Sequence, residues 1–438
     1  MPTSASNAPK ASSKIIPMRR LSRCLLLPGS PAQALPAHCA VGLALPVHCA
    51  VGLALLAACA CGLALLAGCA AIPAARAPGT LPVDVPAELP AILAPAEPLP
   101  TSATLLRPHA RWVAVPWSAL PGWQADRSAD LWPALLAGCA RPAPVWAALC
   151  ARAAAFSPPD DEFARQFLQR ELQPYRVESL AGDAQGLATG YFEPLLLASR
   201  RARPGFGIAV HRPPADLAQR RPYWTRQQLD SLPAAGAGLR GQEIAYLASA
   251  QDLLVLQIQG SGRLRITEPD GSQTTVRLAF AGHNDQPYRS VGRWLIDQGE
   301  LKADGANWPA IRDWAQRAAP ERQQQMLWAN PRVVFFREEA LGDDALGPRG
   351  AQGVALSAGR SVAVDPLAVP YGTPLWIDTT EPLSATPLRR LVMAQDTGSA
   401  ITGAVRVDYF WGAGEAAEQQ AGRMKQGLRL WALWPRGD

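Results

Sequence analysis

Two aspartates near the carboxyl-terminal end of the sequence have surroundings that suit acid–base chemistry. Asp408 lies in the run Val405-Arg406-Val407-Asp408-Tyr409-Phe410-Trp411, whose apolar and aromatic members can exclude water from its carboxyl group. Exclusion of water disfavours the charged form and raises a carboxyl pKa, which keeps a proton available for donation. Asp396 begins the turn Asp396-Thr397-Gly398-Ser399, twelve residues earlier. We predict that Asp408 is the acid–base residue and Asp396 its helper. The alternative for Asp396 is an Asx-turn, in which it bonds its own backbone.

The segment 252–262 combines an apolar run with glutamines and glycines. We interpret it as a strand that enters a glycine-rich turn, so that Gln257, Gln259 and Ser261 alternate onto one face. Amide and hydroxyl groups bond ligands rich in hydroxyl groups, and Gly260 and Gly262 would let a ligand approach the backbone closely. A turn that is simply hydrogen-bonded within itself fits the same residues equally well.

Other chemistries fit the sequence less well. The tetrapeptide from Asp396 to Ser399 also matches the aspartic-protease signature, but that mechanism needs two such aspartates, and one copy requires a homodimer. His283 has no partner at ligand spacing, and no phosphate-binding loop occurs, so we expect neither metal nor cofactor. The formal charge of +6 comes without a dense basic run, so we expect no nucleic-acid partner.

The amino-terminal hundred residues carry export signals rather than a folded domain. Arg19, Arg20 and Arg23 precede a long apolar run that ends in Leu66-Ala67-Gly68-Cys69, which resembles the lipobox of bacterial lipoproteins. We predict a signal peptide over residues 1–68 that contains a decamer repeat, with Cys69 as the lipid anchor. An uncleaved membrane-spanning helix is the alternative. Residues 69–100 are rich in Pro and Ala and predict a semi-rigid linker.

Two cysteines, Cys139 and Cys150, follow the predicted anchor. An exported protein folds in an oxidising compartment, so we interpret them as a disulfide, with two buried free thiols as the alternative. The stretch around them, 132–156, has helical spacing. The bond would therefore join two helices, or a helix and its loop.

The elements that must position these residues change in kind along the chain. Helical spacing marks residues 132–149, 160–175, 290–298 and 308–318. Four tryptophans on helix-like stretches are expected in the core: Trp294, Trp308, Trp314 and Trp328. Alternation predicts strands at 187–194, 333–337, 361–364, 374–379, 391–395, 405–409 and 428–434. The last hundred residues therefore indicate a compact β-barrel or sandwich that follows a mixed α/β region.

Six segments in order resemble the membrane-bound lytic murein transglycosylase A family. They are residues 190–194, 257–264, 287–293, 330–337, 359–365 and 395–401, and the resemblance covers roughly residues 100–436. It implies a mainly β fold with accessory helices. A double-ψ β-barrel catalytic domain would comprise residues 101–195 and 331–438, and a β-rich substrate-binding domain, residues 196–330, would be inserted in it.

The resemblance also implies an activity. Such enzymes cleave the β-1,4 bond between N-acetylmuramic acid and N-acetylglucosamine in peptidoglycan, and the C6 hydroxyl of the same muramoyl residue captures the carbon as a 1,6-anhydro product. One carboxyl group can then act first as acid and then as base, which suits Asp408, at the family's catalytic position. The expected substrate-binding residues are Tyr191, Gln257, Gln259, Gly260, Ser261, Gly262, Tyr409 and Trp411, the last two by stacking on sugar rings.

The predicted lipobox and the family resemblance also imply a location and partners. Ala70 follows the predicted anchor, where many inner-membrane lipoproteins have aspartate. We therefore expect a monomeric, periplasm-facing lipoprotein of the outer membrane that binds peptidoglycan glycan strands and can join cell-wall synthesis or hydrolysis complexes. A non-catalytic peptidoglycan-binding lipoprotein is the alternative that would share this location.

Overall fold

The computed structural model describes residues 103–158 and 160–436. The predicted signal peptide, the anchor Cys69 and the linker lie outside the described residues. The described chain belongs to one compact unit built on two β-sheets. None of its helices has the length and apolar character needed to cross a membrane.

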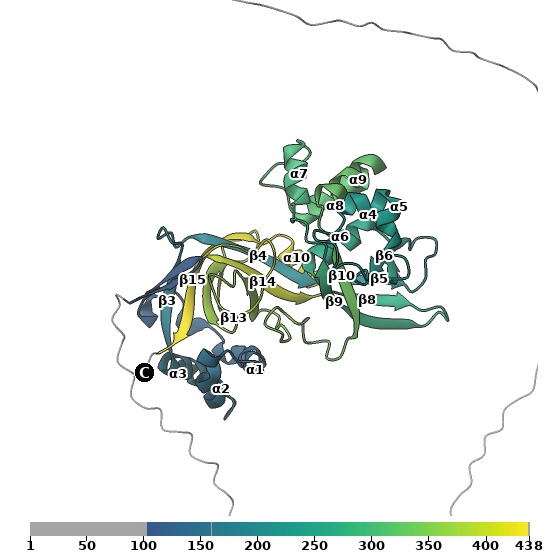
Figure 1. Ribbon diagram of the computed structural model, residues 1–438. Helices are drawn as coiled ribbons and strands as arrows, with labels where there is room; N and C mark the ends of the chain where they lie inside the picture. The colour runs from purple at the N-terminus through teal and green to yellow at the C-terminus, as the bar shows by residue number, and fades with distance from the viewer. Residues whose placement is uncertain (1–102, 159, 437–438) are drawn as a thin grey trace, which may run out of the picture. The chain divides into compact units, whose positions relative to one another are not determined.

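The larger sheet draws its strands from both ends of the described chain (Figure 1). Its order is β1-β2-β3-β15-β12-β13-β11-β14-β4, and a further pairing of β15 with β4 closes the last six strands into a barrel. The strands are β1 (Thr104–Arg107), β2 (Ala110–Ala114), β3 (Leu172–Glu178), β4 (Gly186–Glu193), β11 (Ser361–Val364), β12 (Pro374–Thr380), β13 (Pro387–Asp396), β14 (Arg406–Ala413) and β15 (Lys425–Pro435). The strands predicted from alternation in the last hundred residues are all confirmed, as is the strand that begins near residue 187.

The barrel interior is filled by alternate side chains of these strands, among them Val362, Val364, Val392 and Val407. β-Branched side chains suit a pleated, buried surface, and each buried one contributes roughly 1.5–3 kcal/mol to stability. The barrel wall is therefore a stable base for the side chains that project outward from it.

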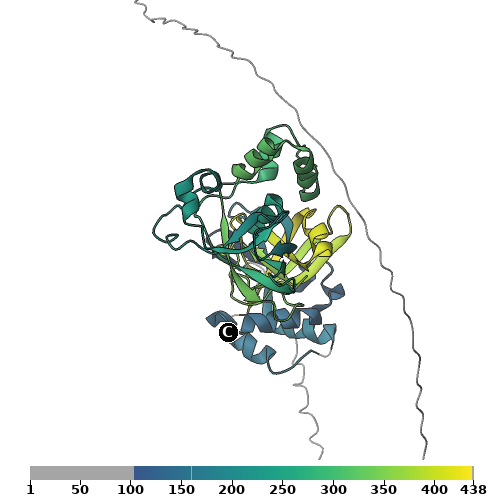
Figure 2. The same cartoon turned by 90° about the vertical axis from the view of Figure 1, so that its right-hand side faces the viewer.

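Three helices cover the outer face of the barrel on one side, where Figures 1 and 2 place them together. They are α1 (Trp132–Cys139), α2 (Ala147–Ala153) and α3 (Asp161–Glu171), with 3-10 turns at Trp117–Ala119, Trp123–Ala125, Ser128–Leu131 and Pro144–Trp146. They pack through Trp132, Leu135 and Phe167 against Trp376 and Trp431 of the sheet. A disulfide joins Cys139 to Cys150 and so ties α1 to α2.

Helix α3 ends earlier than predicted. Asp160 caps its start by accepting a hydrogen bond from the Phe163 N–H at 2.8 Å, but the helix stops at Glu171 rather than near residue 175. Pro174 explains the difference, because it cannot donate to a helical carbonyl and disfavours the helical conformation of the residue before it. The chain enters β3 there instead.

The smaller sheet has the order β10-β9-β8-β5-β7-β6. Its strands are β5 (Leu195–Ser199), β6 (Ile208–His211), β7 (Glu243–Leu247), β8 (Gly262–Thr267), β9 (Gln273–His283) and β10 (Val334–Ala340). Its helices are α4 (Arg226–Ser231), α5 (Pro233–Ala237), α6 (Ala250–Gln259), α7 (Val291–Asp297), α8 (Trp308–Arg317) and α9 (Pro320–Ala329), while α10 (Glu415–Ala421) packs on β4 and β14. Because β10 belongs to this sheet, the sheet extends past the predicted domain boundary at residue 330.

The predicted strand over residues 252–262 is wrong, because this segment forms helix α6. Ser249 caps the helix by accepting from the Asp252 N–H at 3.0 Å, and Gly260 ends it with φ at 79°. A short apolar run cannot by itself distinguish a buried strand from a buried helix, and the cap and the glycine stop decide it here. The glutamines of this segment therefore lie on a helix rather than on one face of a strand.

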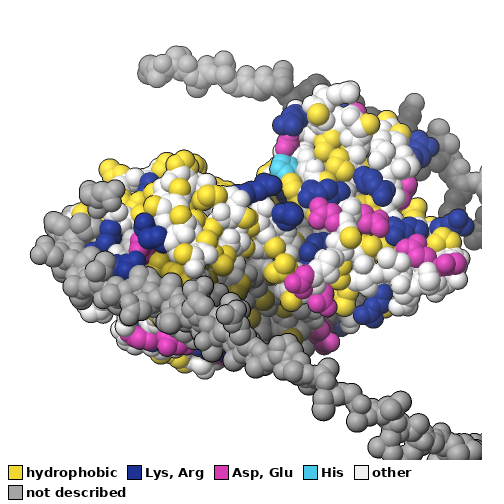
Figure 3. Space-filling model, turned by 90° about the horizontal axis from the view of Figure 1, so that it is seen from below, with side chains coloured by type: hydrophobic (Ala, Val, Ile, Leu, Met, Phe, Trp, Pro, Cys, Tyr) yellow, Lys and Arg dark blue, Asp and Glu magenta, His cyan; other side chains and the backbone are white. Residues whose placement is uncertain are grey.

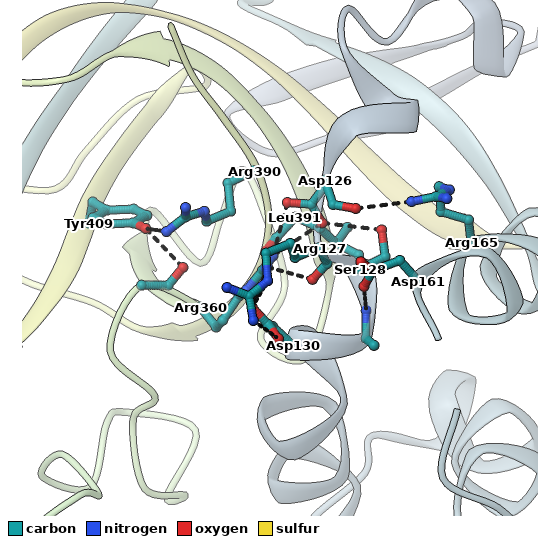
Figure 4. Close-up of polar contacts among 12 residues, drawn as sticks. Asp126, Arg127, Ser128, Asp130, Asp161, Arg165, Arg360, Arg390, Leu391 and Tyr409 are labelled. Atoms are coloured by element: carbon teal, nitrogen blue, oxygen red, sulfur yellow. Dashed lines mark hydrogen bonds and ion pairs between the residues drawn. The ribbon is translucent and has the colours of Figure 1, made fainter. Parts of the chain in front are cut away.

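A buried ion pair ties the segment before α1 to the barrel (Figure 4). Arg360 Nη1 lies 3.2 Å from both carboxylate oxygens of Asp126 and donates to the Leu391 carbonyl at 2.8 Å. Burial raises the pKa of Asp126, and Arg360 opposes that rise. Loss of either partner would therefore leave the other as an unpaired buried charge.

Candidate active site

One row of side chains crosses the barrel wall from strand to strand. Asp396 of β13 pairs in register with Ala363 of β11, and Ala363 pairs with Asp408 of β14. Asp408 in turn pairs with Thr189 of β4, which pairs with Lys425 of β15. All of these residues line the same groove. Neighbouring strands lie about 4.8 Å apart, so the two aspartates are separated by about 10 Å at their Cα atoms, with a small side chain between them.

A β-bulge sets the direction of Asp396. The register between β11 and β13 shifts between Val362 and Ala363, which leaves Gln395 as the extra residue. Its side chain turns toward α1, donates to the Ala134 carbonyl at 2.8 Å and accepts from Ser361 Oγ at 2.6 Å. Bulges commonly redirect a side chain next to a functional site. Here the next residue, Asp396, projects into the groove.

Both oxygens of Asp396 accept hydrogen bonds from the protein. Tyr191 Oη donates to Oδ2 at 3.0 Å, and the Ala351 N–H donates to Oδ1 at 2.9 Å. Burial raises the pKa of Asp396 to about 6, and the charge of Asp408 adds to that rise. Burial and these two carboxylates also raise the pKa of Tyr191 well above its usual range, so its hydroxyl stays protonated as a donor.

Asp408 has one direct hydrogen-bond donor and a cation behind it. Thr189 Oγ1 donates to Oδ1 at 2.5 Å, and Arg406 Nη2 donates to the same hydroxyl at 2.8 Å. Burial raises the pKa of Asp408, while Thr189 and Arg406 act in the opposite direction without cancelling it. The carboxyl group is thus biased toward its protonated form and yet has a partner that can hold the anion.

The groove has two connected parts. The first part has a volume of about 500 Å³, and both aspartates line it together with residues such as Tyr288, Trp308 and Lys425. The second part has a volume of about 690 Å³ and runs along α6, β9 and β10. Among the residues that line both parts are Tyr191, Gln259 and Asp396. Asp408 lies in the first part, and its charge acts on Tyr191 and Tyr288, which line both parts, so a long ligand could extend to both sides of its carboxyl group.

Four of the predicted substrate-binding residues have positions that suit that role. Tyr191 lines both parts of the groove. Gln259 also lines both, and because its carbonyl oxygen accepts from the Phe192 N–H at 3.0 Å, its amide nitrogen is left for the groove. Gly260 and Ser261 line the second part, and a Cβ at Gly260 would meet open space.

Two other residues of that segment have packing roles. Gln257 borders the second part, but its side chain accepts from Arg226 at 2.6 Å and donates to the Val334 carbonyl at 3.3 Å. Gly262 lines neither part of the groove, and a Cβ there would lie 2.4 Å from a methyl carbon of Leu256. Close packing of α6 on β8, rather than ligand access, therefore requires this glycine.

The structure does not place Tyr409 and Trp411, two predicted substrate-binding residues, in the groove. Period-two alternation along β14 sends both side chains to the opposite face from Asp408, into the barrel. Tyr409 is fully buried; its hydroxyl donates to the Gly359 carbonyl at 2.9 Å and accepts from Arg390 at 3.0 Å (Figure 4). Trp411 packs against Tyr409 and directs its indole N–H to the Met424 sulfur at 3.4 Å. Phe410 is the aromatic residue that shares the face of Asp408, and its ring packs on Tyr191 with centroids 5.2 Å apart.

Several groove residues were missed by sequence reasoning. Thr189 bonds Asp408, Arg406 bonds the Thr189 hydroxyl, and Tyr288, on the loop before α7, lines both parts of the groove. Trp308, expected in the core, is only half-buried and lines the first part of the groove. Trp314 is buried as predicted. Tyr288 belongs to the motif segment 287–293 and Thr189 to the strand predicted at 187–194, but sequence alone gave no reason to choose them within those segments.

The fold and site together define a two-part β-protein whose groove carries a raised-pKa carboxyl group on a barrel wall. Family profiles match the chain in two places: one described as the MltA specific insert domain at residues 187–337, and one described as the 3D domain at residues 360–434. Membrane-bound lytic murein transglycosylase A of Escherichia coli (strain K12) is 31% identical over 276 residues, which cover 61% of this chain and 71% of that protein. The chain belongs to the membrane-bound lytic murein transglycosylase A family.

Solved structures agree with the family and the fold. The crystal structure of MltA from Neisseria gonorrhoeae in its monoclinic form matches with a TM-score of 0.65 and 31% identity, covering 78% of this chain and 97% of that one. E. coli MltA with bound chitohexaose matches with a TM-score of 0.59 and 26% identity, covering 78% and 96%. The family and the fold predicted from six ordered motifs, a β-barrel with an inserted second β-rich part, are confirmed.

Proposed function

We propose that this protein is a peptidoglycan lytic transglycosylase in which Asp408 serves first as acid and then as base. The observation that carries the proposal is the row across the barrel wall, in which Asp408 faces the groove beside Thr189 and the nearest carboxylate in the row, Asp396, is two strands away. The family relationship supports the reaction class, and the bound chitohexaose in the E. coli relative supports a glycan strand as ligand.

The reaction needs one carboxyl group to move a proton twice. Protonated Asp408 gives its proton to the glycosidic oxygen as the bond to the muramoyl C1 breaks. The C6 hydroxyl of the same residue then bonds to C1 and returns its proton to Asp408, so the acid is regenerated and no water is consumed. Thr189 holds the carboxylate between the two transfers by its hydrogen bond.

Asp396 suits a supporting role better than that of a second acid–base group. Hydrolytic glycosidases use a second carboxylate to attack the sugar or to activate water. Both oxygens of Asp396 already accept from Tyr191 and from the Ala351 N–H, which positions the Tyr191 ring in the groove. We assign Asp396, Tyr191 and Gln259 to substrate positioning. Residues 196–330, extended through β10, would form the glycan-binding part.

The proposal includes a location. Cys69 would be lipidated after removal of residues 1–68, and residues 69–100 would tether the enzyme to the inner face of the outer membrane, within reach of the wall. The proposed state is a monomer. Its partners would be glycan strands, with cell-wall synthesis or hydrolysis complexes as further contacts.

The test is product analysis by mass spectrometry. A soluble version of the chain that begins at Ala70 is incubated with purified peptidoglycan, beside Asp408→Asn, Asp408→Ala and the exposed control Asp313→Asn. The unmodified protein and the control should release muropeptides lighter by one water than hydrolysis products, and both Asp408 variants should release none. Reducing-end products would mean a hydrolase. Absence of release by a folded, unmodified protein would favour the non-catalytic wall-binding alternative.

A further inference from the structure

The second part of the groove carries charge that a neutral glycan backbone does not need. Three basic and three acidic residues line the first part: Arg406, Arg423, Lys425, Asp304, Asp396 and Asp408. The second part has three arginines, Arg332, Arg337 and Arg349, against the single carboxylate of Asp396. The view in Figure 3 shows Lys and Arg side chains bordering an indentation of the described surface. N-acetylglucosamine, and N-acetylmuramic acid whose lactyl group is amide-linked to a peptide, offer only neutral hydroxyl and amide groups to such cations.

Two of these arginines form no salt bridge or hydrogen bond with a carboxylate among the described residues, although the charge of Asp285 acts on Arg332 from a greater distance. Arg332 Nη1 donates to the Gln286 carbonyl at 3.0 Å, and Arg349 Nη1 donates to the Gly353 carbonyl at 3.2 Å. Arg337 differs, because it forms an ion pair with Glu339 at 2.7 Å. A guanidinium bonded only to carbonyl oxygens keeps its charge and most of its donors for a ligand.

The backbone around Arg332 is fixed from within. Arg226 is buried, and its guanidinium donates to the carbonyls of Asn330 at 3.1 Å and Arg332 at 2.6 Å. Asn284 holds the intervening Pro331 carbonyl at 2.9 Å. The segment that carries the Arg332 side chain is therefore preorganised, which lowers the entropy that a ligand must remove on binding.

We infer that the second part of the groove binds carboxylates of the stem peptides that muramoyl residues carry, through Arg332 and Arg349. The inference rests on the proposed function, since it takes the glycan strand as the occupant of the groove. Free carboxylates of such peptides fit the planar guanidinium fork, which can bind them through two parallel hydrogen bonds. The enzyme would then prefer strands that bear peptides over strands from which an amidase has removed them.

The experiment measures equilibrium binding, so that it does not depend on catalysis. Asp408→Asn protein is sedimented with peptide-bearing and with amidase-denuded glycan strands. A variant that carries Arg332→Gln and Arg349→Gln in addition to Asp408→Asn is measured in the same way. The matched control adds Arg240→Gln, an exposed arginine outside the groove. The double replacement should weaken binding to peptide-bearing strands roughly tenfold and leave denuded strands nearly unchanged, and added salt should shrink the difference.

Equal weakening on both kinds of strand, or none on either, would overturn the inference, since the arginines would then bind the glycan itself or nothing. A loss mainly on denuded strands would overturn it as well and would indicate the bare lactyl carboxylate. Arg349→Gln alone, on an exposed side chain, keeps the test valid if the double variant unfolds. Cleavage that survived Asp408→Asn would refute the proposed catalytic role while leaving this binding comparison readable.

Discussion

The contact between Thr189 and Asp408 allows the proposed mechanism to be tested through pH alone. Thr189→Val keeps the volume of the side chain but removes the hydroxyl that donates to Asp408 at 2.5 Å. That donor stabilises the charged carboxylate, so its loss must raise the pKa of Asp408 further. Because the acid has to start protonated, a higher pKa extends activity to higher pH.

The size of the effect follows from the strength of the bond. A hydrogen bond to a charged group contributes about 1.5–3 kcal/mol, and one pKa unit corresponds to about 1.4 kcal/mol, so the direct effect is about 1–2 units. Arg406 bonds the same hydroxyl at 2.8 Å, and once released its charge can approach the carboxylate and offset part of the rise. A net upward shift of about one unit is expected.

The assay is the pH dependence of kcat/KM for release of anhydro products, which reports ionisations of the free enzyme. The limb on which activity falls with rising pH should move up by about one unit in Thr189→Val. It should stay in place in Thr189→Ser, which keeps the hydroxyl. A limb that moves downward in the valine variant, or that stays in place while the rate is unchanged, would refute the assignment of Asp408 as the acid. A uniform loss of rate with an unchanged limb would instead show that Thr189 only contacts substrate.

Two further predictions concern stability. The pKa of Asp396 is about 6 in the folded protein against an ordinary 3.8, so ionisation of this carboxyl group destabilises the fold. The contribution of the protonated group to stability is complete below pH 3.8 and is lost as the pH rises to about 6. Asp396→Asn should therefore gain about 1–2 kcal/mol in urea unfolding at pH 8, allowing for partial exposure, and almost nothing at pH 4; equal gains at both would contradict the cause. Arg360→Gln leaves Asp126 buried without its cation and should cost about 3 kcal/mol in the same assay. Adding Asp126→Asn should recover part of this loss, whereas the exposed control Arg293→Gln should cost about 0.5 kcal/mol or less.

The sequence predicted the elements that carry the site better than the contacts within it. Alternation located β11, β12, β13, β14 and β15, because in each of them every second residue enters the barrel core. It also placed Asp408 on a strand. It could not show that Asp396 and Asp408 flank Ala363, since that relation depends on which strands pair and on a bulge at Gln395.

The errors have local physical causes. The apolar run in residues 252–262 fits both the period of a helix and that of a strand. The Ser249 N-cap and the left-handed Gly260 C-cap are the features that favour a helix. Tyr409 follows Asp408 directly in sequence, but on a strand this proximity does not bring the two side chains together in space. A neighbour on a strand points the other way, and the Tyr409 hydroxyl, which suggested a ligand contact, is satisfied inside the barrel by Gly359 and Arg390.

The buried Glu193 links the barrel strand β4 to the smaller sheet. It is the last residue of β4, fully buried, and its carboxylate bonds Arg263 of β8 at 2.7 Å and Arg277 of β9 at 2.6 Å. Arg277 also donates to the Leu346 carbonyl at 2.7 Å, on the chain that returns toward the barrel. The outgoing and returning chains of the smaller sheet are thus fastened at one point. That point is joined to Thr189 by one short stretch of β4, roughly 13 Å of extended backbone, so the smaller sheet and the hydroxyl that bonds Asp408 are anchored to the same strand.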